Sequence, residues 1–198
     1  MSIALRALAA DGRQGFVSVK GQVTLDGKSV VVGDIVRVGQ KVVTGPASEA
    51  VLVHQQNAFL LRENTQFMID ESALIPVLRY ISGKVLSVFG KGEKKLRTPT
   101  AAIGIRGTGC YIEAETSRTY FCLCYGEAEL SPLADPEHKE VIKTMHHEHP
   151  LYIGDKEASV MMAKAPVKNH SDAELIMLEG LFGRKPPFYG LNLPPYNM

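Results

Sequence analysis

Short runs of β-branched residues, divided by glycine-containing turns, fill the chain from residue 16 to about residue 130. Within these runs apolar and polar side chains alternate with a period of two, which is typical of strands and not of helices. The first runs are residues 16–19, 22–25, 29–32, 35–38 and 41–44. Asp26-Gly27, Gly33-Asp34 and Gly39-Gln40 lie between runs and suit tight turns. This part of the chain is therefore expected to form paired strands.

The alternation continues through residues 50–54, 58–62, 66–69 and 78–89. Two longer strands, 107–115 and 119–130, are predicted to form a hairpin with Thr116, Ser117 and Arg118 at its tip. About a dozen short strands with little helix predict an all-β protein, built as a sandwich, a barrel or stacked sheets. Periodicity does not specify the order of the strands.

Beyond Ser131-Pro132 the composition changes. Residues 135–139 (DPEHK) are expected to form an exposed loop, and residues 141–145 a further strand that leads into a cluster of histidines. We therefore treat residues 133–165 as an additional strand region that carries the histidine cluster.

A short helix is predicted near the end of the chain. Ser171 and Glu174 form a capping box, which satisfies the free amides of a helix start, so residues 173–182 are expected to be helical up to Gly183. The tail is too rich in proline for regular structure, and residues 166–198 are expected to form this helix and an extended strap. The tail prolines are Pro186, Pro187, Pro194 and Pro195.

Composition excludes several classes of protein. The formal net charge of this 198-residue chain is +1, so there is no strong positive field to gather nucleic acid. No apolar run approaches the roughly 18 to 20 residues of a membrane-spanning helix. Residues 1–15 are interpreted as an N-terminal tail or the remnant of an export signal, and a frayed cytoplasmic N-terminus fits these residues equally well.

A series of glycine-containing motifs follows a fixed order along the strand-rich region. The motifs are residues 21–27 (GQVTLDG), 32–34 (VGD), 38–45 (VGQKVVTG), 98–100 (TPT) and 106–110 (RGTGC). In this order they resemble the FecR domain of bacterial envelope proteins, and the resemblance covers roughly residues 16–132. It implies a multi-stranded sandwich or stacked β-sheets on the periplasmic or otherwise exported side, with a function in binding or sensing and without catalysis. The chain departs from the signalling members, because its 198 residues include neither their anti-sigma segment nor their transmembrane helix.

The most specific part of this resemblance lies in five residues that we interpret as a structural motif. They are Thr98, Pro99, Arg106, Gly107 and Thr108. Gly107 permits a left-handed backbone at a bend before the long hairpin, and Arg106 can reach carbonyl or carboxylate oxygens. We favour this structural role over a role of Arg106 in ligand binding.

The cysteines and a group of histidines form the candidate site. The residues are Cys110, Cys122, Cys124, His146, His147 and His149. Cys122 and Cys124 are two residues apart on a strand, so their side chains lie on the same face. With the tip of the hairpin at residues 116–118, the numbers of two paired residues add up to about 234, which places Cys110 opposite Cys124. His147 and His149 would share a face in an extended segment, with His146 turned away. Thiolates and imidazoles suit a transition metal such as zinc or iron.

Other interpretations of the cysteines remain open at this point. Free cysteines are often small core residues. A disulfide between Cys110 and either Cys124 or Cys122 would leave one of the three thiols over. A thiol hydrolase would need a histidine beside Cys122 or Cys124 and an acid such as Glu148 to orient it.

Three functions follow from these observations. The first is a non-catalytic FecR-like periplasmic domain that contacts another envelope protein or a polysaccharide. The second is a transition-metal-binding or redox-responsive protein that uses the cysteine and histidine cluster. The third is the thiol hydrolase, which we rank last because no family signature accompanies the cysteines.

Overall fold

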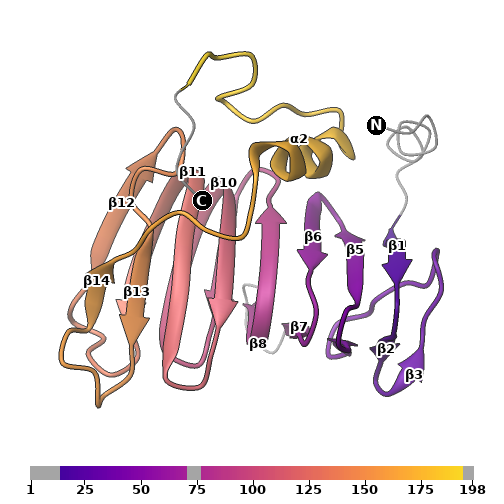
Figure 1. Ribbon diagram of the computed structural model, residues 1–198, viewed down its shortest axis with the longest axis horizontal. Helices are drawn as coiled ribbons and strands as arrows, with labels where there is room; N and C mark the ends of the chain where they lie inside the picture. Colours follow the sequence, from indigo (N-terminus) through magenta and orange to yellow (C-terminus); the bar gives the residue numbers. More distant parts are fainter. Residues whose placement is uncertain (1–13, 71–76, 194–198) are drawn as a thin grey trace.

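The computed structural model describes residues 14–70 and 77–193, and it confirms an all-β protein with one short C-terminal helix (Figure 1). Within these residues the strands form a 14-stranded sheet. Their bounds are β1 (Gly15–Lys20), β2 (Val23–Leu25), β3 (Lys28–Ser29), β4 (Lys41–Thr44), β5 (Glu49–His54), β6 (Asn57–Leu61), β7 (Gln66–Asp70), β8 (Val77–Val88), β9 (Glu93–Arg97), β10 (Ala101–Ala114), β11 (Arg118–Pro132), β12 (Glu140–Thr144), β13 (Leu151–Gly154) and β14 (Met162–Lys164). The helix is α2 (Asp172–Gly180).

Three long strands, β8, β10 and β11, each take part in two layers. The first half of β8 pairs with β7 and β9, whereas its second half pairs with β6 and β10. β10 and β11 divide in the same way, so the sheet folds over into two layers that share one core. The three divisions fall at glycines with positive φ, namely Gly83 (89°), Gly107 (58°) and Gly126 (102°). The predicted bend at Gly107 is present, but it lies inside β10 and not before it.

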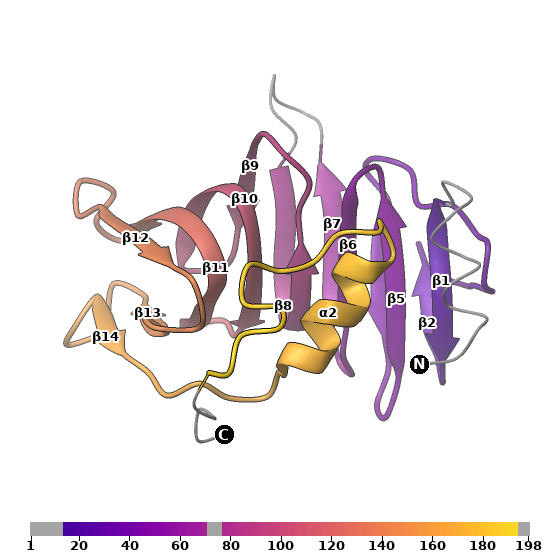
Figure 2. The ribbon, with the colours of Figure 1, turned by 90° about the horizontal axis from the view of Figure 1, so that it is seen from above.

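We name the two layers by what lies on their outer faces. The covered layer comprises β1, β5, β6, β13 and β14 with residues 83–88, 109–114 and 118–125, and the open layer comprises the remaining strands and half-strands. Residues 165–193, which we call the cover, include α2, which packs on β6 and β8. Figure 2 shows α2 lying across the outer face of the covered layer.

Side chains alternate between two cores along the strands of the covered layer. On β11, Phe121 and Leu123 point into the core between the layers, whereas Tyr120, Cys122 and Cys124 point into a second core beneath the cover. Both faces of these strands are therefore buried, whereas the period-two pattern of apolar and polar residues belongs to the open layer, where β4 and β7 are buried at every second residue. Burial on both faces also explains why β6 is apolar throughout except at its first residue.

The Thr-Pro motif has a structural role. The hydroxyl of Thr98 accepts a hydrogen bond from the Ala101 amide at 2.9 Å and lies 2.7 Å from the hydroxyl of Thr119. The hydroxyl of Thr100 lies 2.8 Å from that of Thr119 and 2.9 Å from the carbonyl oxygen of Ile153. These buried hydroxyls join the start of β10 in the open layer to β11 and β13 in the covered layer.

Two predicted strands near the N-terminus are wrong in whole or in part. Residues 35–38 form no strand, and of residues 29–32 only Ser29 belongs to β3. The carboxylate of Asp34 accepts from the Val31 amide at 2.9 Å, and the side chain of Gln40 accepts from the Arg37 amide at 2.9 Å. Because side chains occupy these amides, turns form in place of strands.

The C-terminal helix follows its predicted signals. Ser171 accepts from the Glu174 amide and Glu174 accepts from the Ser171 amide, so the capping box is complete and confirms the prediction. Leu175 and Leu178 are fully buried against the covered layer. In the described residues no helix is long or apolar enough to cross a membrane. Residues 1–13 of the predicted tail, and Pro194 and Pro195 of the strap, lie outside the described residues.

Candidate metal centre

Four side chains able to bind a metal meet beneath the cover. They belong to Cys122, Cys124, His147 and His170, and one ligating atom from each lies within 4.8 Å of the others. All four residues are buried, the most exposed being His147 at 3%. Cys122 and Cys124 share one face of β11, as the sequence predicts.

Cys110 does not join this group, contrary to the sequence-based expectation. It lies opposite Leu123, not Cys124, and packs in the core between the layers. From Ala114 opposite Thr119 the pairing runs without a shift to Cys110 opposite Leu123, one residue away from the expected register; the two register shifts, on either side of Gly109, lie farther from the hairpin tip. A register change of one residue moves a side chain to the other face of a sheet. The alternative of a disulfide from Cys110 to Cys122 or Cys124 is not realised either, because Cys110 lies on the other face, and all three cysteines are free and buried.

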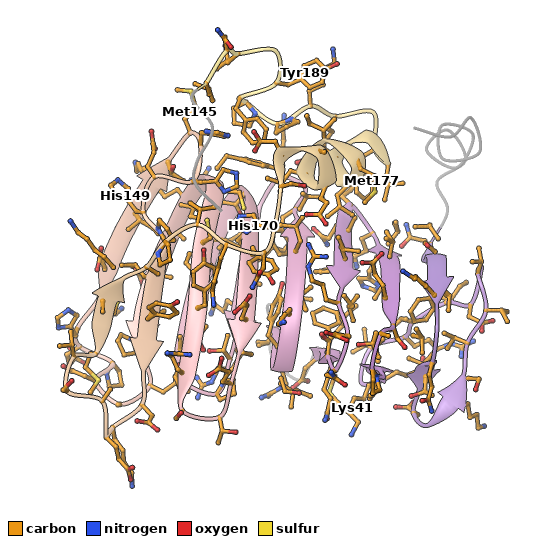
Figure 3. The ribbon with its side chains drawn as sticks, in the orientation of Figure 1. Lys41, Met145, His149, His170, Met177 and Tyr189 are labelled. Atoms are coloured by element: carbon orange, nitrogen blue, oxygen red, sulfur yellow. The ribbon has the colours of Figure 1, made fainter. Side chains whose placement is uncertain are left out.

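The three predicted histidines have different positions. The backbone turns at His147, whose φ is +55°, so the expected extended segment is absent. The His147 amide donates to the Cys124 carbonyl at 3.1 Å, which places the ring over β11. His146 is partly buried, and its Nε2 lies 2.9 Å from the carboxylate of Asp172, which also contacts His147. His149 is exposed and does not join the cluster. Figure 3 shows it near β12, apart from His170.

His170 and Asp172 are the members that sequence reasoning missed. They flank Ser171, the residue that caps α2, so the capping box does define their position relative to the helix. Nothing in the sequence spacing relates that helix start to β11, which lies about fifty residues earlier in the chain. Only the packing of α2 on the covered layer brings the two together.

Hydrogen bonds on the outer sides of the rings determine their tautomers. Nδ1 of His170 lies 2.7 Å from the carbonyl oxygen of Lys168, which can only accept, so Nδ1 carries the proton. Nε2 of His147 lies 3.1 Å from the carboxylate of Asp172 and donates to it. The other ring nitrogens, His170 Nε2 and His147 Nδ1, therefore face the thiols and lie 3.0 Å from each other.

The two thiols differ in acidity. Burial alone would raise the pKa of the Cys122 thiol, but hydrogen bonds from Cys124, His147 and His170 lower it well below its usual value. Burial and the neighbouring Cys122 raise the pKa of the Cys124 thiol well above its usual value. The pair therefore favours one thiolate on Cys122 and one thiol on Cys124.

Part of this cluster resembles a hydrolytic triad, but its surroundings do not suit hydrolysis. Cys122 Sγ lies 3.4 Å from His147 Nδ1, and Asp172 takes the place expected for Glu148. Glu148 instead bonds Thr144 at 2.6 Å, away from the thiols. A nucleophile must meet its substrate, yet the side chain of Cys122 has no exposed surface.

Comparisons with known proteins support the fold. No family model matches this sequence, and no curated protein matches it. Two crystal structures of a candidate anti-sigma factor from Parabacteroides distasonis ATCC 8503 are similar, each with a TM-score of 0.53 and 10% sequence identity. The first comparison covers 73% of this chain and 75% of that chain, and the second covers 79% and 82%. At this identity the similarity establishes a shared fold.

A buried carboxylate near the site links the cover to β10. Glu113 accepts hydrogen bonds from Lys168 at 2.6 Å, Asn169 at 2.7 Å and Tyr111 at 2.9 Å. Burial alone would raise the pKa of the Glu113 carboxyl, but these bonds outweigh burial and hold the pKa below its usual value of 4.5. The ionised form is thus favoured in the folded state.

Replacing Glu113 with glutamine is expected to lower the free energy of unfolding at neutral pH by about 1–3 kcal/mol. A depressed pKa in the folded state stabilises the fold above the unfolded pKa, and this stabilisation disappears as the pH falls through the folded value. Stability of the wild type should thus fall below about pH 4.5, and E113Q should show a weaker fall. Urea unfolding at a series of pH values from about 3 to about 7 measures the difference.

Glu115 provides the matched control for this experiment. It lies on the same hairpin, is 56% exposed and pairs only loosely with Arg118 at 3.3 Å among the described residues. E115Q should change stability by less than about 0.5 kcal/mol at any pH tested. Equal pH profiles for E113Q and the wild type would contradict the assignment of an ionised, buried Glu113.

Proposed function

We propose that this chain is a non-catalytic sensing or regulatory domain of the FecR type, acting on the exported side of the bacterial envelope through contact with another envelope protein or a polysaccharide. The observation that supports it most is the shared fold with the candidate anti-sigma factor, over 73–79% of this chain. A regulatory domain of this kind needs a stable scaffold and exposed loops and strand edges, and no reactive group at its surface. The burial of all three thiols agrees with that requirement.

The FecR motifs also agree with the fold. Thr98 and Thr100 join the two layers, and Gly107 lies at the bend of β10. Arg106 is exposed on the open layer and lines a shallow hollow with Gly104 and Glu127. The motif thus has a structural reason to occur in a chain that folds into these two layers.

Export is the first consequence to test. The gene, expressed from its native start, would be fused at its 3′ end to alkaline phosphatase or to green fluorescent protein. Alkaline phosphatase becomes active only after export from the cytoplasm. Green fluorescent protein becomes fluorescent only when it stays in the cytoplasm, because it does not mature after export in the unfolded state. We expect an active phosphatase fusion and a dark fluorescent fusion. The reverse pair of results would contradict a function on the exported side.

Binding is the second consequence. The purified chain should co-sediment saturably with envelope fragments of its own cell. Loss of binding after protease treatment of the fragments would identify a protein partner, and loss after glycosidase treatment would identify a polysaccharide. Absence of saturable binding to any envelope fraction would contradict the proposal.

A further inference from the structure

Two ring nitrogens, His147 Nδ1 and His170 Nε2, face each other in a buried site. They lie 3.0 Å apart, and the Cys122 sulfur lies 3.4 Å from His147 Nδ1. Without a cation between them their two lone pairs would repel each other at this distance, and water could not solvate them, because both residues are at most 3% exposed. The arrangement requires a positive centre, either a proton or a metal ion, between the two rings.

We propose that Cys122, Cys124, His147 and His170 bind one zinc-type divalent ion as a closed, four-coordinate site. Two thiolates and two imidazoles are a ligand set of structural zinc sites. Zinc bond lengths of about 2.0–2.1 Å to nitrogen and 2.3 Å to sulfur place tetrahedral ligands about 3.3 Å apart for two nitrogens and about 3.5 Å for nitrogen and sulfur. The separations of 3.0 Å and 3.4 Å in the structure are close to these distances between ligands, so small movements of the side chains would admit the ion.

The outer partners of the rings suit this ion. Histidines that bind metals usually donate their other N–H to a carboxylate or a backbone carbonyl. His147 donates to Asp172, and His170 donates to the Lys168 carbonyl at 2.7 Å. Asp172 also holds His146, which thereby becomes a supporting residue and not a ligand.

Aromatic rings close the site on its remaining sides. Tyr111 stacks on His170 with ring centroids 4.6 Å apart, and Phe188 from the strap lies 6.1 Å from the His147 ring. Such an apolar shell keeps water away and strengthens the attraction between a cation and thiolates. Four protein ligands leave no open position on the ion, so the site is structural or regulatory in type.

The ion would fasten the cover to the sheet. Cys122 and Cys124 come from β11, His147 from the turn before β13, and His170 from the residue just before the cap of α2. Three separate parts of the chain thus share one ion. Its removal should free the start of α2 before it disturbs the core between the layers, because that core contains none of the ligands. This inference is independent of export and of any envelope partner.

The experiment is metal analysis of the untagged protein together with matched variants. The wild type, reconstituted with zinc and dialysed, should retain about one ion per chain. C122S and H170A should lose it, whereas C110S and H149A replace the same residue types outside the site and should keep it. With cobalt in place of zinc, the wild type should show the visible bands of tetrahedral Co²⁺ and a thiolate charge-transfer band. Metal retained by C122S and H170A, or absent from the wild type, would overturn the proposal.

A measurement on the wild type alone covers the case in which the variants do not fold. Alkylation followed by mass spectrometry compares the zinc-loaded protein with the protein treated with a chelator. We expect Cys122 and Cys124 to be protected by zinc and labelled after chelation, with Cys110 protected in both. Hydrogen exchange should rise in α2 on chelation. Rapid labelling of Cys122 in the presence of zinc would instead identify a reactive nucleophile and overturn the metal site.

Discussion

Replacing Gly83 with alanine should destabilise the protein by about 2–5 kcal/mol. The φ angle of Gly83 is +89°, a conformation that strains any residue with a Cβ atom. A Cβ atom would also lie 2.4 Å from the Cα of Thr65 and 2.7 Å from the carbonyl oxygen of Asn64. Both neighbouring atoms are backbone, so the clash cannot be relieved by rotating a side chain. Urea unfolding followed by circular dichroism measures the loss.

Gly104 is the matched control for this change. It also lies inside a long strand, but a Cβ atom there meets no atom within 4 Å. G104A should therefore alter stability by less than about 1 kcal/mol, and can raise it, because alanine restricts the unfolded chain. A loss in G83A no larger than that in G104A would show that β8 does not bend as described.

Replacing Phe59 with alanine should cost about 3–5 kcal/mol, because it opens a cavity between the two layers. Phe59 on β6 is fully buried, and its ring centroid lies 4.8 Å from that of Phe67 on β7 in the opposite layer. A second ring, Phe89, packs edge-on at 5.9 Å. The lost contacts therefore join both layers. Thermal and urea unfolding would report the change as a lower midpoint with an unaltered slope.

Phe182 provides the comparison for this prediction. It lies in the cover, is only partly buried and has the Arg184 guanidinium 4.3 Å above its ring. F182A should cost clearly less than F59A, since its site can fill with water and relax. Equal losses in the two variants would contradict a core shared by stacked layers.

Much of the fold was open to prediction from the sequence. Alternation with a period of two indicated strands, and it holds best in the open layer, where β4 and β7 bury every second residue in the core between the layers. The capping box of Ser171 and Glu174 predicted a helix start that the structure confirms. Alternation failed at residues 35–38, where the side chains of Asp34 and Gln40 occupy nearby backbone amides.

Of the candidate site, the sequence could predict only the relation between residues on the same strand. The shared face of Cys122 and Cys124 follows from strand geometry alone. The place of Cys110 depended on the register of β10 with β11, which the turn at the hairpin tip sets. From Ala114 opposite Thr119 to Cys110 opposite Leu123 the pairing is regular and one residue away from the expected register, so Cys110 lies on the other face. The hydrophobic pattern does not fix the length of a turn to within one residue, so the sequence did not specify this register.

Three features of this chain depend on neighbours a few residues away, and the order of amino acids is enough to specify them: the presence of strands, the start of the helix and the shared face of two sulfurs. Two other features emerge only when the whole chain is folded. β8, β10 and β11 bend into two layers, and His170 and Asp172 meet Cys122 and His147 beneath the cover. The physical reason is that contacts between distant segments depend on strand register and on the packing of α2, and both are set by the whole core at once.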